Sequence, residues 1–212
     1  MAERTRIVQL RSGRRPAGEP NSCTLHHPGP PSGPLPPHRE LFGQHYRALR
    51  SLAEGFSRPG LVIAALDAAG VAGSVCLAAK METINTAIIG RHGQADLYLG
   101  ADPTLSLRHL AVILHPRGPG PDVRFRLLDL RTPTAFTDEQ GRRLESLEAE
   151  GPVFVRCGSY ALFLLTTGDG LPWPDDPEDG WQCIPERVHL REEAAEPDRW
   201  CRKELRARWA KQ

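Results

Sequence analysis

Short apolar runs separated by turn residues dominate the middle of the chain. The runs are Leu61–Leu66, Ser74–Ala79, Thr83–Gly90, Asp96–Leu99, Arg108–His115, Val123–Leu130, Pro152–Cys157 and Tyr160–Thr166. Their length of roughly four to eight residues, with Gly, Pro and Asp between them, is typical of strands in an all-β sandwich or barrel. The polar stretch Arg142–Glu150 inside this series predicts a strand-and-turn connection or a single helical turn. No long helical pattern alternates with the strands, so a parallel α/β sheet is not expected.

Other patterns flank the strand series. Residues 39–57 place Leu41, Phe42, His45, Leu49, Leu52, Ala53 and Phe56 at helical spacing, and Ser57, Pro59 and Gly60 follow. This pattern predicts one helix that packs against the following domain, with docking on a partner as the alternative. Residues 1–38 are rich in Arg, Pro, Gly and Ser, a composition that predicts a disordered arm.

The segment 169–212 begins with acidic residues around Trp173 and ends in a basic stretch. Pro197 suits the first turn of a helix, in which Cys201, Leu205 and Trp209 would share one face among Arg and Lys. The expected organisation is therefore a disordered arm (1–38), a flanking helix (39–57), a β-sandwich (61–168) and a Trp/acidic segment with a basic helix (169–212).

Composition narrows the function classes. The formal net charge is +1, so no global field attracts nucleic acid, and only contact through the basic last helix stays as an alternative. Five widely spaced cysteines without a CxxC pair favour a reduced, cytoplasmic setting. No apolar run reaches the roughly 18 residues of a membrane span, so neither a membrane nor secretion is expected. His92, His109 and His115 lack a recognisable metal-ligand pattern, and no cofactor is predicted.

Candidate binding residues lie where apolar runs end and begin. Gly90-Arg91 closes one run, and Ser106-x-x-His109 opens another. Arg91 could bind a phosphate through two donors while Ser106 donates its hydroxyl to the same group. The alternatives are a surface Arg91 paired with Asp96 or Asp102 and a Ser106 that closes a turn. A nucleophile–base pair of Ser106 and His109 lacks an evident orienting carboxylate, so an enzyme is not predicted.

These features resemble the forkhead-associated (FHA) domain of bacterial type, a phosphothreonine-peptide binding module. The resemblance covers roughly residues 61–168. It rests on Ile-Gly-Arg at 89–91, Asp-Leu-Tyr-Leu at 96–99, Ser106-x-x-His109, Leu-Asp-Leu at 128–130 and the closing run from Gly158. It implies an FHA-like β-sandwich with the ligand held by loops at one end.

The resemblance also implies roles for individual residues. Arg91 and Ser106 would contact the phosphate, Thr132 and Thr134 would line the peptide site, and Gly90 and His109 would support the binding loop. Function would be that of an adaptor in Ser/Thr kinase signalling, with a phosphothreonine-bearing partner such as a kinase or its substrate. Thr134 and Ala135 stand where the family usually has Asn-Gly. The alternative is therefore a degenerate FHA-like domain that binds another protein without phosphate.

Overall fold

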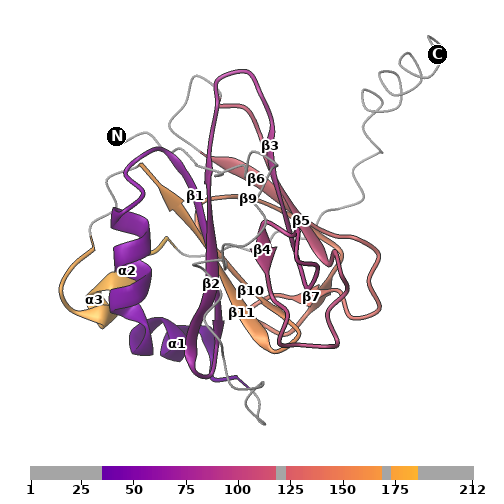
Figure 1. Ribbon diagram of the computed structural model, residues 1–212. Helices are drawn as coiled ribbons and strands as arrows, with labels where there is room; N and C mark the ends of the chain where they lie inside the picture. Colours follow the sequence, from indigo (N-terminus) through magenta and orange to yellow (C-terminus); the bar gives the residue numbers. More distant parts are fainter. Residues whose placement is uncertain (1–34, 118–122, 169–172, 186–212) are drawn as a thin grey trace, which may run out of the picture.

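Two sheets pack face to face in the computed structural model, which describes residues 35–117, 123–168 and 173–185 (Figure 1). The strands of the first sheet are β1 (Gly60–Asp67), β2 (Gly70–Ala78), β7 (Phe136–Thr137), β8 (Arg143–Leu144), β10 (Val153–Cys157) and β11 (Tyr160–Thr167). Those of the second are β3 (Asn85–Gly90), β4 (Leu97–Tyr98), β5 (Leu110–Leu114), β6 (Arg124–Asp129) and β9 (Ser146–Glu150). Residues 1–34 of the arm predicted over residues 1–38 lie outside the described residues, and so does the predicted basic helix near the C-terminus.

The strand order is β2-β1-β11-β10-β7-β8 in the first sheet and β4-β3-β5-β6-β9 in the second. Within each sheet, neighbouring strands pair in the antiparallel direction, except that β3 and β4 are parallel, with Ile89 paired to Leu97. The predicted all-β sandwich is therefore confirmed. The Arg142–Glu150 stretch forms β8 and β9, which agrees with the strand-and-turn reading and not with a helical turn.

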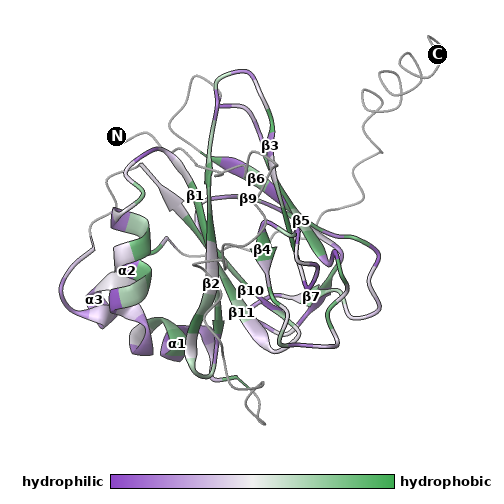
Figure 2. Cartoon of the chain, viewed as in Figure 1, coloured by the Kyte–Doolittle hydropathy of each residue, from purple (hydrophilic) through white to green (hydrophobic). Residues whose placement is uncertain are grey.

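Alternation along β1 divides its side chains between two apolar clusters. Leu61, Ile63 and Ala65 join the cluster between the two sheets. Val62, Ala64 and Leu66 point to the other face and join a second cluster with the helices. Because both faces are covered, β1 and β11 are buried along their whole length. Hydrophobic residues, green in Figure 2, lie along the strands between the helices and the second sheet. Burying one large apolar side chain in such a core contributes roughly 1.5–3 kcal/mol.

The second cluster forms where helices α1 (His38–Gln44) and α2 (Tyr46–Glu54) cover the outer face of the first sheet (Figure 1). The sequence predicted one helix here, but the helix breaks at His45, whose φ of −113° and ψ of 16° are not helical. The break changes which side chains face the sheet. Tyr46 is buried, whereas His45 and Leu52 are only half-buried.

A third helix, α3 (Pro177–Cys183), packs on the same cluster through Trp181. Its N-terminus carries a strong local signal, since the Asp176 side chain accepts from the amides of Glu178 and Asp179 and Pro177 occupies the first turn. The sequence predicts only an acidic segment here, so this helix was not expected.

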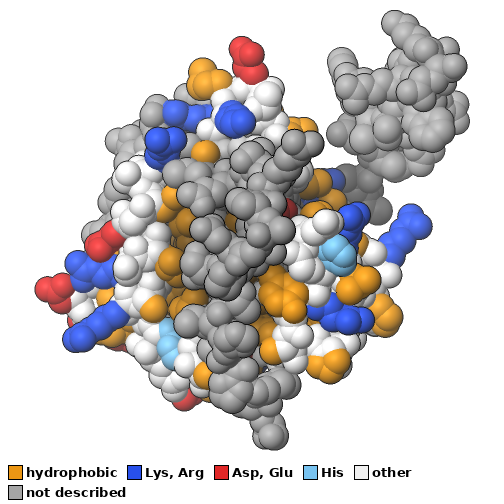
Figure 3. All heavy atoms as spheres, in the orientation of Figure 1, with side chains coloured by type: hydrophobic (Ala, Val, Ile, Leu, Met, Phe, Trp, Pro, Cys, Tyr) orange, Lys and Arg blue, Asp and Glu red, His pale blue; other side chains and the backbone are white. Residues whose placement is uncertain are grey.

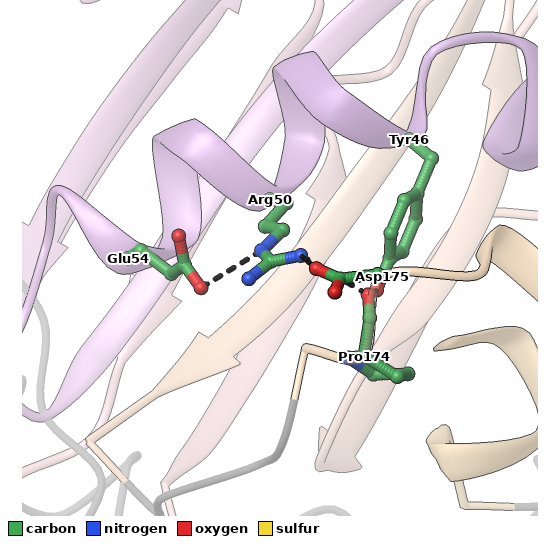
Figure 4. Close-up of polar contacts among 5 residues, drawn as sticks. All are labelled: Tyr46, Arg50, Glu54, Pro174 and Asp175. Atoms are coloured by element: carbon green, nitrogen blue, oxygen red, sulfur yellow. Dashed lines mark hydrogen bonds and ion pairs between the residues drawn. The ribbon is translucent and has the colours of Figure 1, made fainter. Parts of the chain in front are cut away.

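Polar contacts attach the segment before α3 to α2 (Figure 4). The Tyr46 hydroxyl donates to the Pro174 carbonyl at 2.6 Å. Arg50 donates to Asp175 at 2.8 Å and to Glu54 at 2.9 Å. The helices thus form an aromatic-rich layer on the first sheet, on the face that does not pack against the second sheet.

Candidate functional site

Three loops meet at the end of the sandwich near β4 and β7 (Figure 1). They are the β3–β4 loop (91–96), the β4–β5 loop (99–109) and the β6–β7 loop (130–135). Backbone hydrogen bonds join them: Arg91 N donates to Ser106 O at 3.2 Å, and Leu130 N donates to His109 O at 3.0 Å. All four binding residues predicted from the sequence lie on these loops.

Arg91 is exposed, and its Nε donates to the Leu105 carbonyl at 2.6 Å. This bond holds the guanidinium along the loop that carries Ser106 and leaves the two Nη groups for another acceptor. The alternative pairing with Asp96 or Asp102 is not seen among the described residues. Asp96 accepts from the amide of Ile88 instead, and the Asp102 carboxylate is also occupied elsewhere.

Gly90 lies beneath the β4–β5 loop at very close range. A Cβ at this position would lie 2.4 Å from the Leu107 carbonyl oxygen and 3.0 Å from the His109 nitrogen. Real Cβ atoms do not approach backbone atoms so closely, so only glycine lets the loop cross here. The Gly-Arg pair therefore combines a crossing point for the loop with the cation beside it.

His109 is fully buried and organises two of the loops. Its Nδ1 accepts from the Ser106 amide at 3.0 Å, so the ring proton belongs on Nε2. Nε2 lies 3.2 Å from the Ala135 carbonyl and 3.1 Å from the Thr132 hydroxyl. His109 thus contacts the backbone of Ser106, while the Ser106 hydroxyl makes no hydrogen bond among the described residues.

Thr132 and Thr134 occupy different environments in the β6–β7 loop. Thr132 is buried, and its hydroxyl donates to Asp129 at 2.5 Å and accepts from the Ala135 amide at 3.1 Å. Thr134 is exposed, with its hydroxyl 3.5 Å from His109 Nε2. Of the two, Thr134 is the side chain available to a ligand, and the Thr132 hydroxyl has its hydrogen-bonding capacity occupied within the loop.

Two carboxylates shape this end in roles that the sequence did not predict. Asp129 accepts from both the amide and the hydroxyl of Thr132. Asp102 is buried in the β4–β5 loop and accepts from Thr104 at 2.8 Å and from the Ser159 amide at 2.7 Å. The Asp-Pro-Thr sequence after Gly100 is a turn signal that could have revealed Asp102, since an Asp often accepts from the amide two residues on.

Asp102 ties the loop carrying Ser106 to the turn between β10 and β11. Burial alone would raise its pKa, but the hydrogen bonds from Thr104 and Ser159 outweigh burial and leave the pKa below the ordinary aspartate value. Gly158 in that turn has a φ of 57°, and a Cβ there would lie 2.3 Å from the carboxylate. The carboxylate therefore fits into a gap that only a glycine leaves open.

We expect Asp102→Asn to lower the free energy of unfolding by about 1–3 kcal/mol at pH 7, because an amide NH₂ would face amide donors. A group with a lowered folded-state pKa stabilises the fold above its unfolded pKa of roughly 4 and loses that contribution on acidification. The difference from wild type should therefore shrink below about pH 4 in urea unfolding. Asp175→Asn, at a fully exposed carboxylate, is the control, and a difference independent of pH would contradict the assignment.

The described residues show neither a nucleophile–base pair nor a metal site at this end of the sandwich. Ser106 and His109 do not form a hydroxyl–imidazole hydrogen bond among the described residues. Across ranges 35–117, 123–168 and 173–185, no three His, Cys, Asp or Glu side chains gather as a metal ion would need. Within those ranges no helix is both long and apolar enough to cross a membrane.

No protein-family model matches the chain, and no curated protein sequence is similar to it. Among solved structures, it is similar to the FHA domain of the CT664 protein from Chlamydia trachomatis, at 21% identity and a TM-score of 0.39 over 50% of this chain and 95% of that one. It is also similar to the yeast Dun1 FHA domain in complex with a doubly phosphorylated peptide (13% identity, TM-score 0.40, covering 65% and 89%). A third is Mycobacterium tuberculosis EmbR in complex with a low-affinity phosphopeptide (19%, 0.37, covering 58% and 28%).

The fold is a β-sandwich of two sheets, as the sequence predicted. These neighbours, with TM-scores of 0.37–0.40, carry no argument beyond that likeness. What this end of the sandwich can do follows from its own geometry: an exposed guanidinium and a hydroxyl on hydrogen-bonded loops, above a buried histidine.

Proposed function

We propose that this protein binds phosphothreonine peptides and acts as an adaptor in Ser/Thr kinase signalling. The observation that carries the proposal is the arrangement of Arg91 and Ser106 on directly hydrogen-bonded backbone segments. Arg91 keeps two Nη donors, and Ser106 keeps its hydroxyl, so both can donate to one phosphate. Their backbone positions are set beforehand by Gly90 and His109, which reduces the ordering cost of binding.

The phosphate is expected to provide most of the affinity. Hydrogen bonds to a charged group contribute roughly 1.5–3 kcal/mol each, and a few of them support an affinity on the order of micromolar once ordering is subtracted. The preference for phosphothreonine, and a partner such as a kinase or its substrate, rest on the resemblance of the Gly90-Arg91 and Ser106-x-x-His109 motifs to those of the FHA family. A non-catalytic role and a cytoplasmic location remain predictions.

The direct test is titration calorimetry with one peptide in phosphothreonine, phosphoserine and unphosphorylated forms. We expect micromolar binding of the phosphothreonine form only. Ser106→Ala should weaken that binding about 10-fold or more, since one charge-assisted hydrogen bond is lost. Ser51→Ala, at an exposed position on α2, is the control and should bind as wild type. Equal binding of the phosphorylated and unphosphorylated peptides would overturn the proposal.

A second candidate function is protein binding without phosphate. Leu107 and Leu130, with 51% and 39% of their surfaces exposed, lie on the same loops and could contact an apolar partner. Ala135 stands where the family usually has glycine, and its φ of 53° is strained for a residue with a side chain. If this candidate is correct, the partner should still bind after phosphatase treatment, and the Arg91→Ala variant should still bind it. Phosphothreonine binding predicts that the partner is lost in both experiments.

A further inference from the structure

Several arginines at the binding end lack an acidic partner. By contrast, each arginine in the following set has an ion pair with Asp or Glu: Arg39, Arg50, Arg124, Arg126 and Arg142. Arg108 and Arg131, on the loops of the candidate site, and Arg143, in the adjacent strand β8, have no carboxylate partner among the described residues. All three are exposed. Their positive charges are therefore available to a ligand.

The three arginines lie on, or are bonded to, the loops of the proposed phosphate site. Arg108 lies between Ser106 and His109 in the β4–β5 loop. Arg131 precedes Thr132 in the β6–β7 loop, with a φ of 60° that few non-glycine residues adopt. Arg143, from β8, donates to the Pro133 carbonyl of that loop at 3.1 Å. Lys and Arg side chains gather over β5 and β7 on the face shown in Figure 3.

Nearby carboxylates offset part of this charge. Asp102 and Asp138 are buried, and Asp129 is half-buried and accepts from the Thr132 amide. Asp96 and Glu145 are the exposed carboxylates on or beside these loops in the described part of the chain. Among exposed side chains, the four arginines at positions 91, 108, 131 and 143 outnumber these two carboxylates, so the exposed surface of the loops carries a local positive excess although the whole chain has a net charge of only +1.

We propose that the ligand is a phosphothreonine segment flanked by acidic residues, read by Arg108 and Arg131 on either side of the phosphate site. This inference rests on the proposed function and specifies its substrate class. A peptide suits the surface better than nucleic acid, because the exposed Leu107 and Leu130 are the immediate neighbours of these arginines. An apolar side chain beside each arginine suits a peptide with both acidic and apolar residues. The evenly charged phosphate backbone of a nucleic acid offers no apolar group at these places.

The test compares three phosphothreonine peptides that differ only in the three residues on each side: neutral, acidic or basic. In about 50 mM salt we expect the acidic peptide to bind roughly 10- to 25-fold tighter than the neutral one, since each of the two new charge pairs at the surface contributes about three- to fivefold. The advantage should fall steeply with salt. In the double variant Arg108→Gln/Arg131→Gln it should disappear, while affinity for the neutral peptide changes less than about threefold.

Arg47→Gln, on the exposed face of α2, removes a charge away from the loops and should leave the preference intact. Equal binding of the acidic and neutral phosphopeptides would overturn this inference and leave the proposed function standing. Absence of binding to every phosphothreonine peptide would overturn both. A single-stranded oligonucleotide that binds tighter than the acidic phosphopeptide, with the same loss in the double variant, would assign the arginines to nucleic acid and overturn the inference.

Discussion

Arg91→Ala is expected to weaken phosphothreonine-peptide binding about 100-fold or more, from micromolar towards millimolar dissociation constants. The loss of two charge-assisted hydrogen bonds, at roughly 1.5–3 kcal/mol each, accounts for this change. Arg91 has no acidic partner in the described residues, so its removal leaves no carboxylate without an ion-pair partner. The fold should therefore stay intact, and circular dichroism should match wild type.

Arg91→Lys separates charge from geometry. Lysine keeps the positive charge but lacks the planar pair of Nη donors and the Nε bond to Leu105. We expect its affinity to lie between those of wild type and Arg91→Ala, measured by titration with the same peptide. Arg47→Ala serves as the matched control for loss of one exposed arginine. Undiminished binding by Arg91→Ala would sink the phosphate-binding role.

Gly90→Ala should be the most damaging single methyl group in the binding loops. The added Cβ would lie 2.4 Å from the Leu107 carbonyl oxygen and 2.9 Å from its carbon, and both are backbone atoms that cannot rotate away. We expect a loss of about 2–3 kcal/mol in the free energy of unfolding. Because the displaced loop carries Ser106, peptide affinity should fall as well.

Gly93→Ala, three residues further along the chain in the β3–β4 loop, is the control. A Cβ at Gly93 would meet no atom within 4 Å, so the substitution should change stability by less than about 0.5 kcal/mol. Urea unfolding of the two variants, with peptide titration of each, checks the prediction. If the two alanine variants were equally stable, the close crossing of the loop over Gly90 would be wrong.

The strands were predictable because alternation and turn residues act locally. The eight predicted runs correspond to β1 to β6, β10 and β11, with ends that differ by no more than four residues. The prediction placed Asp67 and Gly70 in a longer connection, whereas Asp67 accepts from the amides of Ala69 and Gly70 and closes a tight turn between β1 and β2. The short strand β7 (Phe136–Thr137) has too little sequence to show a period and exists through its pairing with neighbours.

The candidate site was predictable in its residue types and less so in its roles. Motif spacing identified Arg91, Ser106 and His109, and the loops bring them together. The inward orientation of Thr132 depends on Asp129 and His109, which lie 3 and 23 positions away. The contact of Asp102 with Ser159 spans 57 positions, so no local pattern could reveal it.

By itself, the sequence determined the β-sandwich and the order of its strands along the chain, because side-chain alternation and turn chemistry operate over a few residues. Only the tertiary structure decided which arginines keep their charge available and which loops share a buried histidine. Those properties depend on contacts between segments distant in sequence, where pairing and burial are set by the packing of the whole domain.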